Sequence, residues 1–335
     1  MTATIRDVAK HAGVGVGTVS RVINNRKSVS DATREKVLAA IEDLNYSPNL
    51  AARQLSTGRT MNIGVIAPFF TRQSVVERLK GIEAVLTKSP YGLNIFNVET
   101  KDRKKVSFRE IPRRERIDGL LIITLVPDKE EVQGLLESEV PIVSIDAELP
   151  MVSNVLIDDV AGGMQATQHL IGLGHRKIGF VSGEREDELG NGSAIDRYTG
   201  YVRALHKAGI PFCNEFQLEG QHSRYAGYMM ARQLLNLANP PTAIVASSDT
   251  HAMGVLRAAQ ETNINVPYEL SIIGYDDIEV AEYINLTTIR QPLFESGELG
   301  TRLLLDELQT PSKTPNHIYL PTTVIVRGTT AVPRS

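Results

Sequence analysis

From residue 62 onward, apolar runs typical of buried β-strands alternate with segments whose apolar residues recur at helical spacing. The expected strands are 62–68, 93–98, 119–124, 141–146, 154–159, 177–183, 242–247 and 270–277. The expected helices are 74–87, 161–173, 198–208, 225–238, 251–262 and 295–309. Strict β-α alternation predicts parallel, doubly wound sheets with helices on both faces. The pattern is too long for one such sheet, so we expect two α/β lobes.

The first sixty residues carry a different pattern. Thr4 and Asp7 fit an N-terminal capping signal, and the apolar spacing that follows predicts a helix over 5–12. Gly13 suits the left-handed position that ends this helix, and Gly15 suits the N-cap of a second helix over 16–24. A third helix is expected after Ser30 and Asp31, with Val37, Ala40, Ile41 and Leu44 as its apolar stripe. Three short helices with a tight glycine turn indicate a helix-turn-helix.

The run GVGVGT at 13–18 could instead suggest a nucleotide-binding loop. That reading requires G-x-G-x-x-G after a strand, whereas these glycines are spaced by two and follow a helix. Gly17 lies in the first turn of the second helix. It either allows the helix backbone to approach DNA bases closely or is simply tolerated at a helix end.

Length and charge agree with a multidomain binding protein. A chain of 335 residues suggests two or three domains. Residues 1–60 hold nine Lys and Arg against five Asp and Glu, and the remainder holds 27 against 34. A basic head on an acidic body suggests a polyanionic partner, although a solvated charged face would look similar. Cys213 is the single cysteine, which excludes a disulfide framework and a thiolate zinc site.

Several further functions are not expected. We find no secretory signal and no apolar run long enough for a membrane span, so a cytoplasmic protein without a membrane partner is expected. The common motifs of hydrolases, zinc proteases and P-loop enzymes are absent from the sequence. We therefore expect no catalytic residues, no metal site and no cofactor. The basic runs at 101–105 and 112–116 are interpreted as a solvated helix face or loop.

A short helix is expected between the head and the body. Ser47 and Pro48 fit its N-cap and first position, and Gly58 fits its end. A helix of about two turns is marginal alone in water, so this one should need a partner to remain folded.

These N-terminal segments resemble a known family. TIRDVAKHAGV, TVSRVIN, VSDATREKV and LNYSPNLAARQLS are similar to the headpiece and hinge of the lac repressor/galactose repressor family of bacterial transcription factors. The resemblance implies base contacts by Val16, Gly17 and Arg21, phosphate contacts near the second helix, and a hinge leucine, Leu55, that wedges open a base step in the minor groove. The complete set of implied DNA-binding residues is Thr4, Val16, Gly17, Thr18, Ser20, Arg21, Asn24, Asn49, Ala52, Arg53 and Leu55. The sequence departs from the family at Gly15 and Gly17.

The remainder resembles the family's effector domain, which is built like a type I periplasmic sugar-binding protein. DGLLI, GHRKIGFVSG, RYTGYVRAL, SDTHAMGVLRAA, VPYELSIIGYDD and LTTIRQPLFESG occur in the family's order. The resemblance implies a headpiece over 1–47, a hinge helix over 48–59 and an effector-binding and dimerisation domain over 60–335. Within that domain we expect an N-lobe at about 61–160 and 291–320, and a C-lobe at about 161–290 and 321–330.

Ligands of doubly wound sheets bind beyond the carboxyl ends of strands, where Asp146 and Asp276 occur in this sequence. Asp249 and Asp277 also follow strands, and Asp249 suits a structural cap or hinge better than a ligand contact. By resemblance, the effector pocket is lined by Phe69, Phe70, Asp146, Arg197, His222, Ser248, Asp276 and Gln291.

The expected protein is a homodimeric regulator, most simply a repressor, of a near-palindromic operator. A small ligand between the lobes, expected to be a sugar, controls its DNA affinity. Two alternatives remain open at this stage. The effector could be a corepressor, or a partner protein could act as in catabolite control. A more remote alternative, a periplasmic-type sugar-binding protein, would lack the helix-turn-helix head.

Overall fold

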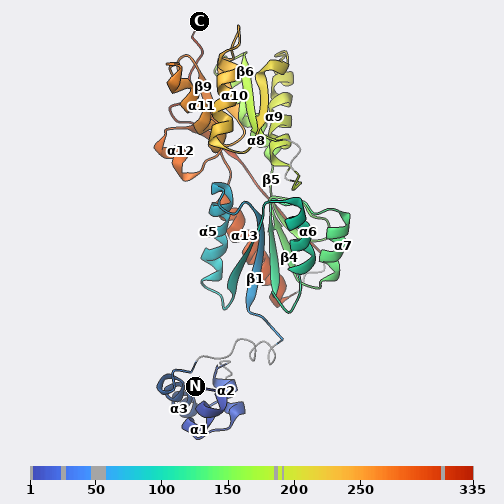
Figure 1. The fold of residues 1–335 in the computed structure, drawn as a ribbon, viewed down its shortest axis with the longest axis vertical. Coiled ribbons are helices and arrows are strands. Elements are labelled where there is room, and N and C mark those ends of the chain that lie inside the picture. The colour runs from blue at the N-terminus through green and yellow to red at the C-terminus, as the bar shows by residue number, and fades with distance from the viewer. Residues whose placement is uncertain are drawn as a thin grey trace. The chain divides into compact units, whose positions relative to one another are not determined.

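In a computed structural model, the described residues are 3–23, 28–46, 58–184, 188–190, 192–310 and 314–334. The chain forms two compact units, Met1–Thr60 and Met61–Ser335, here called the headpiece and the body. Figure 1 shows the helices of the headpiece in dark blue and the two-lobed body in colours that run from lighter blue at β1 to red. Among the described residues, no helix is long and apolar enough to cross a membrane.

The described part of the headpiece contains three helices, as predicted: α1 (Ile5–Ala12), α2 (Val16–Ile23) and α3 (Asp31–Asp43). Gly13 has φ = 66° and ends α1 in the left-handed region that favours glycine. The carbonyl of Gly15 accepts hydrogen bonds from the amides of Thr18 and Val19, which begins α2. The helices enclose one small core, formed by Val8, Ala9, Val19, Val22, Val37 and Ala40.

The body contains two mostly parallel sheets, which confirms the predicted α/β class. The N-lobe sheet has the order β11-β5-β4-β3-β1-β2 and is parallel throughout. Its strands are β1 (Asn62–Pro68), β2 (Gly92–Val98), β3 (Gly119–Ile123), β4 (Ile142–Ile145), β5 (Ser153–Ile157) and β11 (His317–Leu320).

The C-lobe sheet has the order β12-β10-β9-β8-β6-β7. Its strands are β6 (Ile178–Gly183), β7 (Gln217–Gly220), β8 (Ala243–Ala246), β9 (Ser271–Asp276), β10 (Thr287–Arg290) and β12 (Thr323–Ile325). Only the pairing of β10 with β12 is antiparallel among the described strands. The chain passes between the sheets after β5, after β10 and after β11, so three connections join the lobes.

Helices cover both faces of each sheet. In the N-lobe, α5 (Gln73–Leu86) and α13 (Leu293–Gln309) pack together, as do α6 (Lys101–Glu110) and α7 (Lys129–Glu137) (Figure 1). In the C-lobe, α8 (Asp159–Gly172) packs with α9 (Ser193–Lys207), and α10 (Arg224–Leu235) packs with α11 (Asp249–Glu261). Successive residues of a central strand enter opposite cores: Leu121 of β3 joins one N-lobe core, and Leu120 and Ile122 join the other. This two-sided burial explains the continuous apolar runs in the sequence.

Reciprocal glycines bring three helix pairs into backbone contact. A Cβ on Gly200 of α9 would lie 2.2 Å from the carbonyl oxygen of Val160 in α8, and one on Gly163 of α8 would lie 2.2 Å from that of Arg197 in α9. Gly81 with Gly297 joins α5 to α13 in the same way, and Gly227 with Gly254 joins α10 to α11. Since no larger residue fits without displacing backbone, these glycines set the distance between the helices.

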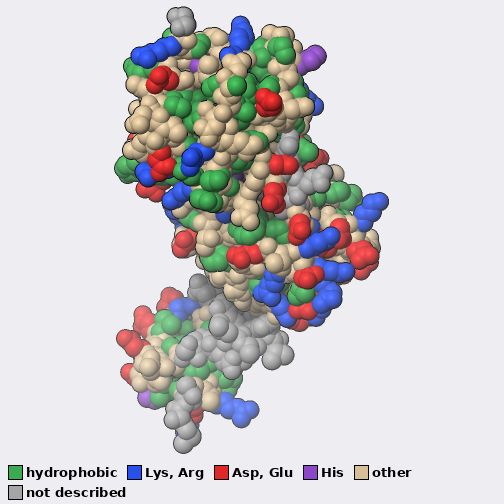
Figure 2. Space-filling view, turned by 45° about the horizontal axis from the view of Figure 1, so that its top comes forward, with side chains coloured by type: hydrophobic (Ala, Val, Ile, Leu, Met, Phe, Trp, Pro, Cys, Tyr) green, Lys and Arg blue, Asp and Glu red, His purple; other side chains and the backbone are tan. Residues whose placement is uncertain are grey.

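Several elements were not predicted. They are α6, α7, the short helix α12 (Glu279–Tyr283), and the strands β7, β10 and β11. The interpretation of 101–105 as solvated is wrong for Lys104, which is buried on α6, donates to the carbonyl of Val126 (2.6 Å) and lies 3.3 Å from Glu131. On the face of the body shown in Figure 2, basic and acidic side chains are interspersed. Arg114, for example, lies 3.6 Å from Glu139, so these basic runs do not form a uniformly positive surface.

Candidate functional sites

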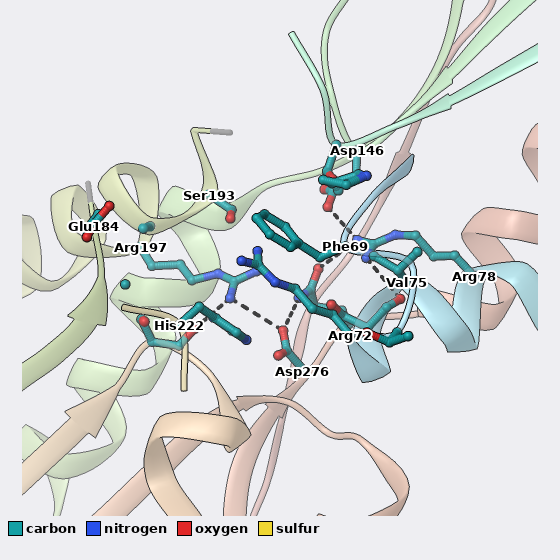
Figure 3. A pocket seen from close by; sticks show the side chains of 18 of the residues that line it. Phe69, Arg72, Val75, Arg78, Asp146, Glu184, Ser193, Arg197, His222 and Asp276 are labelled. Atoms are coloured by element: carbon teal, nitrogen blue, oxygen red, sulfur yellow. Dashed lines mark hydrogen bonds and ion pairs between the residues drawn. The ribbon is translucent and has the colours of Figure 1, made fainter. Parts of the chain in front are cut away.

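A cavity of about 490 Å³ lies at the carboxyl ends of strands from both sheets (Figure 3). The N-lobe contributes Pro68, Phe69, Thr71, Arg72, Ser74, Val75, Arg78, Thr124 and Asp146 to its lining, and the C-lobe contributes Gly183, Glu184, Ser193, Ala194, Arg197, Gln221, His222, Ser247 and Asp276. Gln291, in the connection from β10 to α13, completes the lining. The position agrees with the rule that doubly wound sheets bind ligands beyond their carboxyl ends.

Arg197 is fixed on the C-lobe wall by three partners. Its Nε donates to Asp159 (2.8 Å), and its Nη1 donates to the carbonyl of Ser247 (2.6 Å) and to Asp276 (3.4 Å). The guanidinium also stacks on Tyr275, with its central carbon 3.8 Å from the ring centroid. Burial opposes the charge, but Asp159 and Asp276 outweigh it and raise the pKa of Arg197 above its usual value. Arg197 is therefore a rigid, permanently charged donor.

A second buried arginine stands on the N-lobe wall. Arg78 of α5 is 1% exposed, donates through Nη1 to the carbonyl of Ser74 (3.2 Å), and forms an ion pair through Nη2 with Asp146. The same Nη2 lies 3.4 Å from the side-chain oxygen of Gln291. Gln291 in turn donates to Asp276 (2.6 Å). A continuous polar chain thus links the carboxylates of the two lobes through the inter-lobe connection.

Burial shifts the pKa values of both carboxylates in this hydrogen-bonded network, Asp146 and Asp276. Burial raises the pKa of Asp146 to about 6, although Arg78 acts in the opposite direction. Burial likewise raises the pKa of Asp276 to about 6 against the effect of Arg197. Charged groups whose pKa is shifted by burial in a cleft are typical of functional sites.

Two histidines pack against each other in the C-lobe, one at the cavity wall and one behind it. The rings of His222 and His251 meet edge to face at 5.0 Å, and only His222 lines the cavity. His251 Nδ1 lies 2.8 Å from the Ser248 hydroxyl, and its Nε2 lies 3.2 Å from the carbonyl of Gln221. Because that carbonyl can only accept, the proton belongs on Nε2. Burial lowers the pKa of His251 to about 4 and holds that of His222 well below its usual value.

The structure brings six of the eight predicted pocket residues to the cavity: Phe69, Asp146, Arg197, His222, Asp276 and Gln291. Phe70 and Ser248 do not line it. The Phe70 side chain is 41% exposed, and its amide donates to the side chain of Asn97 (3.1 Å). Ser248 is 1% exposed and caps α11 by accepting from the amide of His251, so the neighbouring Ser247 lines the cavity instead. In each case the adjacent residue lines the cavity: Phe69, which was also predicted, and Ser247, which was not.

The remaining carboxylates at the strand ends have structural partners. Asp249 is fully buried and accepts hydrogen bonds from the Thr288 hydroxyl (2.6 Å) and the amide of Ile278 (2.9 Å). Asp277 forms ion pairs with Arg290 and Arg327, each at 2.7 Å. Neither lines the cavity.

The cavity residues that were missed in the sequence include two arginines, Arg72 and Arg78. A signal for Arg78 was present, because it occupies a position on the apolar face of α5, three residues after Val75 and four before Ile82. An arginine on a buried helix face needs a partner or a function. Arg72 directly precedes the helix, and its guanidinium carbon lies 3.9 Å from the centroid of the Phe69 ring.

The predicted DNA-binding residues of α2 lie on its exposed side. Val16, Gly17 and Arg21 are exposed, Thr18 and Ser20 are half-buried, and Val19 and Val22 face the core. Thr4 is exposed at the start of α1, where its hydroxyl donates to Asp7 (2.7 Å). No atom lies within 4 Å of the place where a Gly17 Cβ would stand, so packing among the described residues does not require glycine there. Asn24, Asn49, Ala52, Arg53, Leu55 and most of the expected hinge helix lie outside the described residues.

Comparison with known proteins agrees with this combination of units. Residues 4–49 match the model of bacterial regulatory proteins of the lacI family, and residues 167–330 match that of a periplasmic binding protein-like domain. The chain is 33% identical to catabolite control protein A of Priestia megaterium over 335 residues, which cover 98% of this chain and 100% of that protein. It is 36% identical to the transcriptional repressor PurR of Photorhabdus laumondii over 313 residues, covering 91% and 90%.

Solved structures show the same architecture. The lac repressor dimer bound to operator and the anti-inducer ONPF matches with a TM-score of 0.86 at 29% identity, covering 99% of this chain and 100% of that one. The complex of the transcriptional regulator CelR with cellobiose matches with a TM-score of 0.72 at 31% identity, covering 98% and 99%.

A helix-turn-helix unit and a two-lobed body with a polar cavity define a DNA-binding transcriptional regulator with a ligand-binding domain. Within that class, the chain belongs to the lacI family of bacterial regulatory proteins.

Proposed function

We propose that the protein represses transcription as a dimer on a near-palindromic operator, and that a small carbohydrate in the cavity controls its DNA affinity. The observation that carries this proposal is the cavity itself, whose charged side chains come from both lobes and are joined through Gln291. A ligand that contacts both walls would favour one angle between the lobes. It could therefore act on DNA binding through differential affinity for two conformations.

On the DNA side, we assign the exposed face of α2 to the major groove. Val16 and Gly17 would approach base edges, and Arg21 would contact guanine through two hydrogen bonds. The proposed phosphate contacts are Thr4, Thr18, Ser20 and Asn24. Asn49, Ala52 and Arg53 would read the minor groove, with Leu55 wedging the central step as an apolar residue can.

On the ligand side, directed hydrogen bonds from Arg197 and to Asp146 and Asp276 suit hydroxyl groups. The Phe69 ring suits an apolar face of the ligand, and His222 and Gln291 complete the proposed contacts. Similar solved structures include the complex of CelR with cellobiose and a LacI family regulator from Enterococcus faecium with bound ribose. Their chemistry supports a carbohydrate here.

The alternative of catabolite-control type is not favoured. Identity to catabolite control protein A is 33%, whereas identity to a PurR protein is 36%, so similarity does not select a partner-protein mechanism. In the proposed role the protein acts by binding and not by catalysis, in the bacterial cytoplasm on the nucleoid.

Fluorescence anisotropy with a palindromic operator carrying a central CG step tests this function. We expect specific binding by the full chain, a loss of discrimination on Arg21→Ala of about 1–3 kcal/mol, and a change of affinity with one carbohydrate in a panel. Release from DNA would indicate an inducer, and tighter binding would indicate a corepressor. Equal affinity for operator and random DNA would contradict the proposed role of α2.

A further inference from the structure

Helix α5 directs its N-terminal turn at the cavity. Arg72, Ser74 and Val75, from the N-cap and first turn of this 14-residue helix, all line the cavity wall. The first turn contains no acidic side chain, and no side-chain hydrogen bond caps it. By contrast, α9, whose first turn also reaches the cavity, has Asp196 in that turn. The amides of a helix N-terminus attract negative charge, so α5 offers a place for an anion.

Arg78 provides an independent indication of a ligand at the same place. It lines the cavity one and a half turns into α5 and is 1% exposed. Its Nη1 and Nη2 have acceptors, but its Nε–H is buried and has no hydrogen-bond partner among the described residues. A buried charged donor without an acceptor is costly. An oxygen atom of a ligand would satisfy it.

Arg72 adds a second positive charge from the same lobe. Its guanidinium lies over the Phe69 ring and extends across the cavity toward His222 of the C-lobe (Figure 3). Its charge contributes to the lowered pKa of His222. The imidazole on the opposite wall is therefore kept as a neutral polar group beside the arginine.

The charges of the lining are separated by lobe. The N-lobe wall carries Arg72 and Arg78 against Asp146 alone, whereas the C-lobe wall carries Arg197 against Asp276 and Glu184. A ligand with a negative group at one end and hydroxyl groups at the other would match both walls. Its hydroxyls could donate to Asp276 while its anionic oxygens face α5.

We propose that the ligand of this cavity is an anionic sugar derivative, whose phosphate or carboxylate binds at the N-terminal turn of α5 between Arg72 and Arg78. This inference rests on the proposed function, because it specifies the chemical class of the effector. A carboxylate offers two coplanar oxygen atoms and a phosphate offers three in tetrahedral arrangement, and either group can accept paired hydrogen bonds from a guanidinium.

Calorimetry of the full chain tests the proposal at fixed salt. The probes are inorganic phosphate and matched series of glucose, galactose and mannose, each with its 6-phosphate and its uronic acid. We expect at least one phosphate or uronate to bind at least tenfold more tightly than its neutral sugar. The member of the series with the lower Kd identifies which anionic group the site prefers.

Variants assign the effect to α5. Arg72→Gln removes a half-buried side chain and should reduce the preference for the anionic member at least tenfold, as should Arg78→Gln if it folds. Lys80→Gln is the matched control, because it removes the same charge from an exposed position on the same helix, outside this cavity. It should leave the preference unchanged.

Parallel operator titrations separate the possible failures. If neutral sugars bind as tightly as their anionic partners and change operator affinity, the anionic site is wrong and the proposed function stands. An anionic preference that survives Arg72→Gln would also overturn the assignment to α5. If no probe binds, the inference is overturned. If operator binding is absent as well, the proposed function fails with it.

Discussion

At the scale of single residues, the ion pair between Arg78 and Asp146 lines the cavity and is also expected to affect the stability of the body. Both side chains are almost completely buried, and they come from α5 and from the end of β4. Removing one member leaves the other charge buried without compensation, whereas removing both does not. The pair therefore offers a direct test of the described geometry.

Arg78→Met should destabilise the body by about 3–5 kcal/mol because Asp146 then loses its counter-charge. Adding Asp146→Asn should recover most of that loss, since the buried charge is gone. Urea unfolding of the full chain, followed through the transition of the body, measures both effects. A double variant as unstable as Arg78→Met alone would show that the two side chains do not form this pair.

His251 gives a prediction for pH dependence. Burial lowers its pKa to about 4, from 6.5, so the folded protein excludes a proton that the unfolded chain binds between these values. Stability should therefore rise with pH across this window. Compared with His251→Gln, the wild-type protein should lose about 1–2 kcal/mol more stability on going from pH 7.5 to pH 5. Urea unfolding at both pH values measures this difference, and parallel pH dependence in the two proteins would contradict it.

At the scale of elements, glycines position the helices that carry cavity residues. Arg197 lies on α9, and α9 contacts the backbone of α8 at Gly163 and Gly200. Gly134 of α7 is the natural comparison, because nothing lies within 4 Å of the place where its Cβ would stand. Gly200 and Gly134 are therefore both helical, but only Gly200 is packed against another helix.

Gly200→Ala should destabilise the body by about 1–3 kcal/mol, since the added methyl group forces α8 and α9 apart. It should also weaken ligand binding, because Arg197 moves with α9. Gly134→Ala should instead stabilise the protein by up to about 1 kcal/mol through helix propensity. Thermal unfolding and calorimetry of both variants check these signs. Equal effects of the two substitutions would contradict the helix contact.

The same scale explains what could be predicted from the sequence. Central strands such as β1 and β3 are buried on both faces and read as apolar runs, so they were found. The strand β7 lies at a sheet edge and contains the polar residues Gln217 and Glu219. The strand β10 contains buried threonines, and Thr288 donates a hydrogen bond to Asp249. Neither strand has the run of apolar residues from which a buried strand is predicted, since buried positions can also be polar.

The site was predictable where the strand ends determine it. Asp146 and Asp276 follow apolar runs directly, so the topology places them at the cavity. The turn after a strand decides which of two adjacent residues faces inward, and sequence pattern does not fix that turn. Both Phe69 and Phe70 were predicted to line the cavity, but only Phe69, with φ = 43°, does so. Arg78 lies within a helix and does not follow a strand end in the sequence, so only its place on the apolar face of α5 indicated it.

At the scale of the whole molecule, a regulator must couple its cavity to its DNA-binding surface. Coupling between two ligands is reciprocal. If the cavity ligand changes the affinity for the operator by some factor, the operator must change the affinity for that ligand by the same factor. This requirement holds for an inducer and for a corepressor.

The decisive measurement is the operator Kd of the full chain without ligand and at saturation with the tightest-binding sugar derivative, paired with the ligand Kd of free and operator-bound protein. We expect both affinities to change by the same factor, of about 5–150-fold. An operator affinity that stays constant while the cavity is saturated would contradict control of DNA binding by this cavity.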